Sequence, residues 1–216
     1  MFGIGAGRGV KVFPSVPGGA AGVGYIEDGA SDTTQSVTVP TTINAGDLLL
    51  LFSALDNNAT ITTITDWTQL TYANGSNIGF QVCWKIADGL ETDFTYTTSA
   101  ASRTINRCYR VINAHRSAAP ENTVSNGTST NADPPELTPT WGSRKTLWFA
   151  VAGINGAQVA SAYPTNYDDN QYADEVGISV SYASASRELA ATSDNPGAFT
   201  TTNQAWAAST VAVRPL

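Results

Sequence analysis

Short runs of apolar residues, separated by clusters of Gly, Asn, Asp and Pro, make up most of the 216-residue chain. Every second residue of Asn77–Ile86 is apolar, which places one face of an extended strand in a core. Leu48–Leu55 is almost continuously apolar, as expected of a strand that is buried on both faces. No segment sustains the apolar period of a helix. The pattern therefore predicts an all-β protein.

The same signals predict strands in further segments, which brings the expected total to about eight. These segments are Gln35–Val39, Thr92–Thr97, Thr104–Ile112, Lys145–Ala152, Val176–Tyr182 and Ala205–Arg214. Turn-forming residues separate several of them, and hairpin turns are expected at these positions. They are Asn74-Gly75, Asp88-Gly89, Asn126-Gly127 and Asn195-Pro196-Gly197.

The chain also repeats itself faintly. Three pairs of segments are similar: Gly46–Ala54 with Arg144–Ala152, Asn77–Trp84 with Glu175–Tyr182, and Ile105–Val111 with Trp206–Val213. In the second pair the glycines Gly79 and Gly177 are 177 − 79 = 98 positions apart. Two pseudo-repeated halves of about four strands each are what an antiparallel two-sheet β-sandwich requires, and we expect one of jelly-roll type.

Residues 1–30 differ from the rest, because they carry many glycines and show little periodicity. Glycine occupies every second position from Gly3 to Gly9, which matches neither nucleotide-binding loop, and no strand precedes it and no helix pattern follows. We therefore expect residues 1–30 to be an arm for anchoring or assembly, and residues 31–216 to be the sandwich domain. The arm side chains expected to make contacts are Phe2, Ile4, Arg8, Val10, Lys11 and Phe13.

Charge and composition narrow the classes of partner. A net charge of −7 argues against nucleic acid, whose phosphates need a basic face. The longest apolar run has the length of a strand, too short to span a bilayer, so no membrane partner is expected. The N-terminus carries no apolar signal region, and we expect synthesis in the cytoplasm without a signal peptide. Most of the polar side chains are uncharged hydroxyls and amides, as in β-proteins that contact other proteins or sugars.

Residues with catalytic or metal-binding chemistry are few. His115 is the only histidine, which disfavours histidine-rich zinc sites and serine nucleophile chemistry. Cys83 and Cys108 lie in strand-like runs, where buried free thiols are favoured over a disulfide. No catalytic constellation is evident, and no cofactor is expected.

The best metal candidate is an acidic cluster in the second half. Asp168, Asp169 and Asp174 supply oxygen ligands of the kind that Ca²⁺ prefers. Their spacing does not follow an EF-hand loop, and a solvated loop between strands is the favoured interpretation.

Aromatic residues outside the predicted strands could stack on sugar rings, as in carbohydrate-binding modules. Trp141 lies between a proline and a glycine, and a Tyr-rich loop follows later in the chain. The residues expected to contact a glycan are Trp141, Tyr163, Tyr167 and Tyr172. Packing caps over a core are the competing interpretation.

Five short motifs occur in a particular order. They are Ala45–Leu50, Asp66–Leu70, Cys83–Glu91, Cys108–Val111 and Ala205–Pro215. This order resembles a widespread family of phage and prophage β-sandwich proteins, whose pattern runs AGDLL…GWT…YYKVADGSE…YRG and closes on a strand ending in Arg-Pro. The resemblance extends from about residue 35 to the end of the chain. It departs at Asp66, where the family has Gly, and at Val111–Asn113, which replaces a Gly.

The resemblance implies a virion-surface protein, such as a capsid decoration, a head spike or a tail or fibre module, and brings no catalytic site. We therefore expect a non-enzymatic structural component of a virion that contacts other capsid or tail subunits through its arm. A homo-oligomer is expected, and this kind of assembly favours a trimer. The alternative is a carbohydrate-binding module that recognises a host cell-surface glycan, and a polysaccharide-cleaving enzyme would need paired carboxylates in a cleft.

Overall fold

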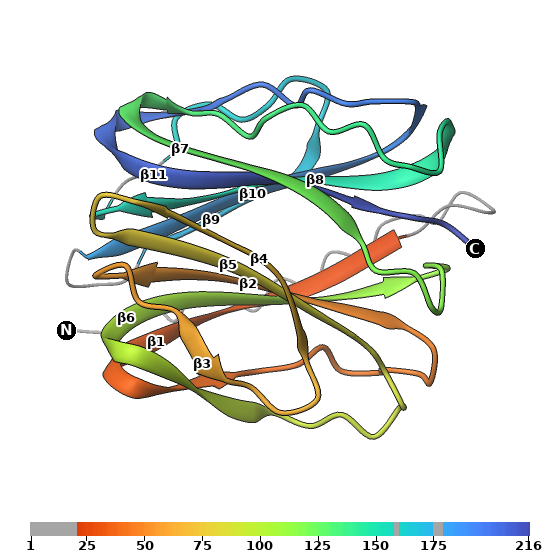
Figure 1. Cartoon of the computed structure of the whole chain (residues 1–216), viewed down its shortest axis with the longest axis horizontal. Helices are drawn as coiled ribbons and strands as arrows, with labels where there is room; N and C mark the ends of the chain where they lie inside the picture. Colours follow the sequence, from red (N-terminus) through yellow and green to blue (C-terminus); the bar gives the residue numbers. More distant parts are fainter. Residues whose placement is uncertain (1–20, 158–159, 175–178) are drawn as a thin grey trace, which may run out of the picture.

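The computed structural model describes residues 21–157, 160–174 and 179–216, which form two β-sheets packed face to face (Figure 1). The strands of these residues are β1 (Ala21–Val37), β2 (Leu48–Asp56), β3 (Ile61–Thr63), β4 (Thr68–Gly75), β5 (Ile78–Ile86), β6 (Phe94–Ile112), β7 (Glu121–Ala132), β8 (Arg144–Asn155), β9 (Asp168–Asp174), β10 (Val180–Ala191) and β11 (Phe199–Val213). Within the same ranges there is no helix with the length and apolarity needed to cross a membrane.

The two sheets repeat the same order of strands. The first has the order β1-β6-β2-β5-β4, with β3 also paired to β6, and the second has the order β7-β11-β8-β10-β9. Strands β2, β5 and β6 therefore occupy the places that β8, β10 and β11 occupy in the second sheet. These are the three pairs of segments that are similar in sequence. The predicted antiparallel sandwich with two pseudo-repeated halves is confirmed.

The path of the chain is simpler than the jelly-roll type that we expected. Each half of the chain builds one sheet, and the described chain passes from the first sheet to the second once, after β6. Alternation of apolar and polar residues identifies a strand and its buried face, but not the sheet that the strand joins. The hydrophobic pattern could therefore predict the two-layer architecture without predicting this connectivity.

Hydrophobic clusters lie between the sheets and on both outer faces. In the central cluster Phe52 of the first sheet contacts Phe149 of the second, with ring centroids 5.5 Å apart. Leu51 points the other way, into a cluster on the outer face of the first sheet, and Trp148 belongs to the matching cluster on the second. Leu48–Leu55 is thus buried on both faces, as its continuous apolar sequence predicted.

The sandwich begins earlier than residue 31. The backbone of β1 pairs with β6 from Ala21, opposite Ile112, to Val37, opposite Phe94. The last third of the segment expected to be an arm is therefore part of a strand. This part of the strand was not predicted, because its glycine-rich sequence shows no apolar periodicity. Backbone pairing at a sheet edge does not need apolar side chains. Residues 1–20, with all six arm side chains named above, lie outside the described residues.

Two polar segments expected to be a turn or a loop are edge strands. Asn126-Gly127 lies in the middle of β7 rather than in a hairpin turn, and residues 168–174 form β9 rather than a solvated loop. Each strand pairs with one neighbour, β7 with β11 and β9 with β10. An edge strand exposes much of its surface, so its sequence does not need the apolar periodicity on which strand prediction depends.

Cys83 and Cys108 are buried free thiols, as favoured from the sequence. Both lie opposite Leu51 of β2, Cys83 on the β5 side and Cys108 on the β6 side. Two strand spacings separate their backbones by about 10 Å, which is beyond the reach of a disulfide. Burial raises the pKa of the Cys83 thiol to about 11, so the thiol stays protonated at neutral pH.

Candidate functional site

The acidic residues proposed as calcium ligands do not share one face of β9. Asp168 is exposed and Asp169 is buried, because neighbouring residues of a strand point to opposite sides. The carboxylate of Asp169 lies 3.7 Å from the guanidinium of Arg107, and the side chain of Asp174 lies outside the described residues. Across the described ranges there is no group of three or more His, Cys, Asp or Glu side chains that could hold a metal ion.

The ion pair between Arg107 and Asp169 connects the two sheets. Arg107 belongs to β6 and Asp169 to β9, and both are buried. The Arg107 guanidinium carbon also lies 4.5 Å from the ring centroid of Tyr109, and its Nη1 donates to Gln171 at 3.2 Å. Burial raises the pKa of the Tyr109 hydroxyl to about 12. This cluster holds the edge strand of the second sheet against the first.

Three of the four rings expected to contact a glycan pack against the outer cluster of the second sheet. Tyr167 is only 5% exposed, and Trp141 and Tyr163 are half-buried against the same cluster. The indole Nε1 of Trp141 donates to Thr146 Oγ1 at 3.0 Å, which fixes the ring. Tyr172 is half-buried on β9, opposite Ala183. These rings cover a core, and Tyr167 has no free face on which a sugar could stack.

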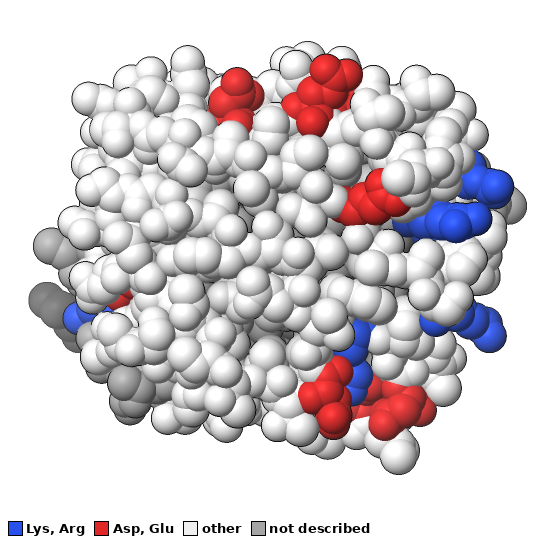
Figure 2. Space-filling view, in the orientation of Figure 1, with Lys and Arg blue, Asp and Glu red and all other residues white. Residues whose placement is uncertain are grey.

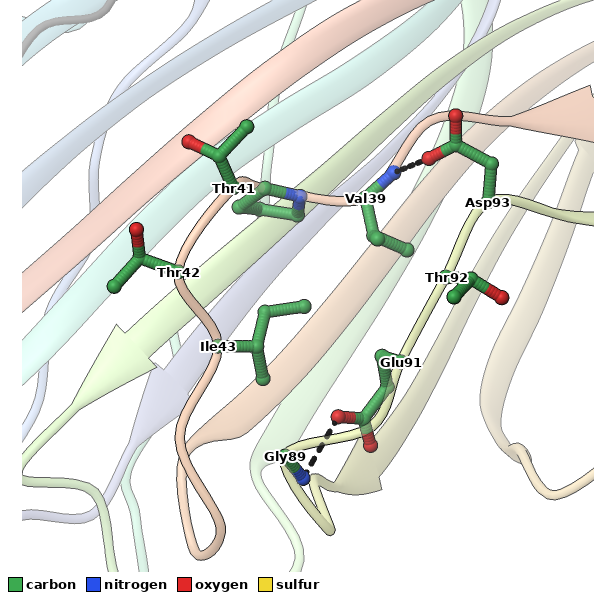
Figure 3. Close-up of a pocket in the computed structure, with 9 residues that line it drawn as sticks. Val39, Thr41, Thr42, Ile43, Gly89, Glu91, Thr92 and Asp93 are labelled. Carbon is green, nitrogen blue, oxygen red and sulfur yellow. Dashed lines mark hydrogen bonds between the residues drawn. The ribbon is translucent and has the colours of Figure 1, made fainter.

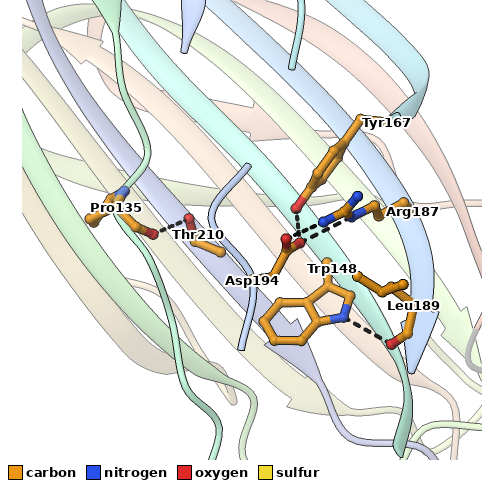
Figure 4. Close-up of polar contacts among 7 residues, drawn as sticks. All are labelled: Pro135, Trp148, Tyr167, Arg187, Leu189, Asp194 and Thr210. Carbon is orange, nitrogen blue, oxygen red and sulfur yellow. Dashed lines mark hydrogen bonds and ion pairs between the residues drawn. The ribbon is translucent and has the colours of Figure 1, made fainter. Parts of the chain in front are cut away.

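A polar cluster holds Tyr167 in place (Figure 4). Its hydroxyl donates to Asp194 Oδ2 at 2.5 Å, and Arg187 forms an ion pair with the same carboxylate through Nε and Nη2. The Arg187 guanidinium carbon lies 4.7 Å from the Tyr167 ring centroid. Burial and the hydrogen bond to Asp194 raise the pKa of the Tyr167 hydroxyl. The cluster ties the loop before β9 to the connection between β10 and β11.

A pocket of about 470 Å³ lies beside the first sheet, between residues 39–43 and residues 89–93 (Figure 3). One end of the pocket is closed by the Val39 N–H, which donates to Asp93 Oδ1 at 3.0 Å. Val39 is buried and Ile43 is half-buried against the outer cluster of the first sheet. The pocket therefore has an apolar floor and a rim of threonine hydroxyls.

Backbone hydrogen bonds close the other end of the pocket. The Gly46 N–H donates to the Ala87 carbonyl at 2.8 Å, and the Ala87 N–H donates to the Asp47 carbonyl at 2.8 Å. Gly89 has a positive φ of 87°, and a Cβ there would lie 2.9 Å from the backbone nitrogen of Ala45. Hydrogen bonds thus connect residues 39–47 and residues 87–93 at both ends of the pocket. These contacts hold the two walls of the pocket in place.

The carboxylate of Glu91 faces this pocket but is fully engaged. It accepts hydrogen bonds from the backbone N–H groups of Asp88 at 2.9 Å and Gly89 at 3.0 Å, and Lys85 Nζ lies 3.1 Å away. Burial acts to raise the pKa of the Glu91 carboxyl, but these contacts outweigh it and lower the pKa. Glu91 therefore holds the turn in place as an anion and is not poised to exchange protons with a ligand.

Thr42, on the pocket wall, has a strained backbone. Its φ is 80°, in the left-handed region that a β-branched residue seldom occupies. Strain of this kind costs about 1–3 kcal/mol and is concentrated at active sites, ligand clamps and switch regions. The turn predicted at Asp88-Gly89 forms part of one wall of the pocket. The residue pattern around Thr42 did not indicate the other wall. The strain at Thr42 depends on the hydrogen bonds that hold residues 39–47 at both ends, and these form only in the folded protein.

The geometry defines a two-sheet sandwich with repeated halves, one open pocket described beside its first sheet and polar clusters that fasten its loops. No protein-family model matches the chain. No curated protein matches it, and no solved structure does.

Proposed function

We propose that this protein is a non-enzymatic structural component of a phage-like virion, held at the virion surface through its N-terminal arm and in contact with other capsid or tail subunits. The order of motifs that resembles phage and prophage virion-surface proteins supports this. The structural observation that carries the proposal is a face of the sandwich where an edge strand of each sheet meets the other, each of them paired on one side only.

Strands β4 and β7 form this face. β4 is the last strand of the first sheet, β7 is the first strand of the second, and the two contact each other. Both lie at the front of Figure 1. In the same view, Figure 2 shows a surface that is largely uncharged, with Lys, Arg, Asp and Glu gathered toward its margins. Only Glu121 is charged among the twelve residues of β7.

An unpaired edge of this kind favours association. Its free backbone N–H and C=O groups are a template for another strand, and monomeric proteins block such edges with Lys, Pro or bulges. β7 contains neither Lys nor Pro. The Ser, Thr and Asn side chains of β7 cost less to remove from water than charged ones, and the cores of protein interfaces are depleted in charge. These properties suit a subunit that is covered on this side by a protein partner.

Quantitative mass spectrometry of purified virions tests the proposal. The full chain is expected in the particles, and a chain without residues 1–20 is expected to fold, to stay soluble and to be lost from them. The cut follows residue 20 because β1 begins at Ala21. Absence of the full chain from the particles, or particles that retain the truncated chain in full amount, would contradict the proposal. Circular dichroism of the truncated chain provides the folding control.

The pocket favours glycan recognition as a second candidate function. Its volume of about 470 Å³ lies in the range of small-molecule pockets, and its apolar floor and hydroxyl rim match a sugar ring. The expected contacts at Trp141, Tyr163 and Tyr167 are less suited, because these rings pack on a core. Titration with methyl pyranosides, followed by backbone NMR shifts at residues 39–43 and 89–93, tests this function. Shifts confined to other residues would exclude this site.

A further inference from the structure

The face formed by β4 and β7 contains a strip of uncovered side chains. On β7, Thr123 and Ser125 are turned to the outer side, where their hydroxyls donate to the carbonyls of Pro135 at 3.3 Å and Asp133 at 2.5 Å. The alternate residues of the same strand, beginning with Val124 and Asn126, point toward the first sheet. They are exposed, and Val124 keeps 41% of its surface in solvent. The β7 strand therefore extends over the edge of β4 without being covered there.

We call this strip the β4–β7 seam. It consists of the inward-turned side chains of β7 and the free edge of β4, and its exposed residues are Val124, Asn126, Thr128, Thr130, Thr68, Gln69 and Asn74. Within the described residues, β4 pairs only with β5 and β7 pairs only with β11. A strand added to β4 would continue the first sheet and would lie beneath the exposed side of β7.

The N-terminal segment of the chain has the sequence of such a strand. From Phe2 to Val10 a residue with a side chain alternates with glycine. In an extended strand this alternation leaves one face without side chains. In a strand added to β4, the face that carries Phe2, Ile4 and Val10 would turn toward the exposed side chain of Val124, and the bare face would turn away from β7. Phe2–Phe13 has twelve residues, the same length as β7.

The same chain cannot easily supply this strand to its own seam. Ala21 begins β1, which is at the opposite edge of the first sheet from β4. Four strand spacings, about 19 Å, separate the two strands, and the straight path runs through the core. Residues 14–20 span at most about 25 Å when fully extended. A path around the end of the sandwich uses that length and leaves none for the turn into the seam.

From the seam and this alternation we infer that residues 2–13 of one copy add as a strand to the β4–β7 seam of a neighbouring copy. This inference rests on the proposed function, for which it names the acceptor of the arm. Backbone hydrogen bonds to β4 supply affinity, and the face with Phe2, Ile4 and Val10 covers the exposed Val124. Arms passed from copy to copy in this way join the copies into a closed ring where the rotation between neighbours closes, and into an open filament where it does not.

Cysteine cross-linking between separate chains tests the inference. One chain carries Ile4→Cys and the other Val124→Cys, and the native thiols do not interfere because both are buried. The matched control is Thr95→Cys, an exposed strand residue on the β1 side of the first sheet. We expect cross-linked dimers with Val124→Cys and none with Thr95→Cys. We also expect sedimentation velocity to show an oligomer for the full chain and a monomer for the chain without residues 1–20.

Equal cross-linking at the two positions would overturn the inference, and so would cross-links that form only within one chain carrying both Ile4→Cys and Val124→Cys. The two proposals fail separately. If virions contain the full chain and lose the truncated one, but the seam is not cross-linked, only the acceptor is wrong. If the seam is cross-linked but the chain is absent from virions, the oligomer stands and the virion function falls.

Discussion

The indole ring of Trp206 covers Gly127, its partner in the β7–β11 ladder, and occupies the space that a side chain there would need. A Cβ at Gly127 would lie 2.7 Å from Cζ2 of the indole. The ring is held in this position because its Nε1 donates to Ser129 Oγ at 3.1 Å. The dipeptide Asn126-Gly127 is therefore a point of close approach between a backbone and a ring.

Gly127→Ala is expected to lower the free energy of unfolding by about 1–3 kcal/mol, because the new methyl group forces the indole out of its position. Asn126→Ala is the control. Asn126 is exposed on the same strand, and its replacement should change the free energy by no more than about 0.5 kcal/mol. Urea unfolding followed by Trp fluorescence measures both. Equal stability of the two variants would mean that the ring can move aside freely.

Tyr167→Phe tests the polar cluster over the second sheet. The variant keeps the ring and removes the hydroxyl that donates to Asp194, a buried carboxylate. Hydrogen bonds to charged groups contribute about 1.5–3 kcal/mol, and a loss in that range is expected in urea unfolding. Tyr163→Phe is the control, since Tyr163 packs edge to face on Phe199 and no partner of its hydroxyl is described. A loss as large for Tyr163→Phe would show that the cluster is not the cause.

Most of the central strands could be predicted because they are apolar. Leu48–Leu55 and Asn77–Ile86 agree with β2 and β5 to within one residue at either end. Thr92–Thr97 and Thr104–Ile112 were predicted as two strands, but the first from Phe94 onward and the whole of the second belong to the single strand β6. The small and polar residues between them interrupt the apolar pattern, whereas pairing with β1 continues on both sides of the interruption.

The edges and the pocket could not be predicted from the same signal. The β7 residues from Thr123 to Asn131 include one apolar side chain, Val124, so hydrophobic periodicity carries no information about this strand. Tyr167 lies in a sequence typical of an exposed loop, and its burial depends on Asp194 and Arg187, which are distant in sequence. Local patterns cannot report contacts that form only when the two connecting segments fold together.

Thr42→Gly is expected to raise the free energy of unfolding by about 1 kcal/mol. Glycine relieves the strain that a φ of 80° imposes on threonine. The free energy gained in this way exceeds the entropic cost that glycine adds by making the unfolded chain more flexible. Thr41→Gly is the control, because Thr41 does not have a positive φ, and the same substitution there should destabilise the protein by about 0.5–1 kcal/mol. Thermal unfolding of the two variants should therefore shift in opposite directions. Shifts in the same direction would contradict a strained Thr42.

The protein is expected to lose stability steeply in alkali. Burial raises the pKa of Cys83 from 9.0 to about 11 and the pKa of Tyr96 from 10.0 to about 12. A raised pKa means that the folded state keeps its proton while the unfolded state releases it. Stability is therefore complete below pH 9, falls as the unfolded thiol ionises, and falls faster above pH 10. Each such group contributes about 1.4 kcal/mol per pH unit between its two pKa values.

Urea unfolding at intervals from pH 8 to pH 11 measures this slope, and two variants assign the parts that come from Cys83 and Tyr96. Cys83→Ala should lessen the loss that begins at pH 9, whereas Tyr96→Phe should leave that part unchanged and lessen the loss above pH 10. Each variant is compared with its own stability at pH 8, because Tyr96→Phe also removes the hydrogen bond from its hydroxyl to Asn106 Oδ1 at 2.7 Å. A free energy of unfolding that stays constant up to pH 11 would show that these buried groups reach solvent before the protein unfolds.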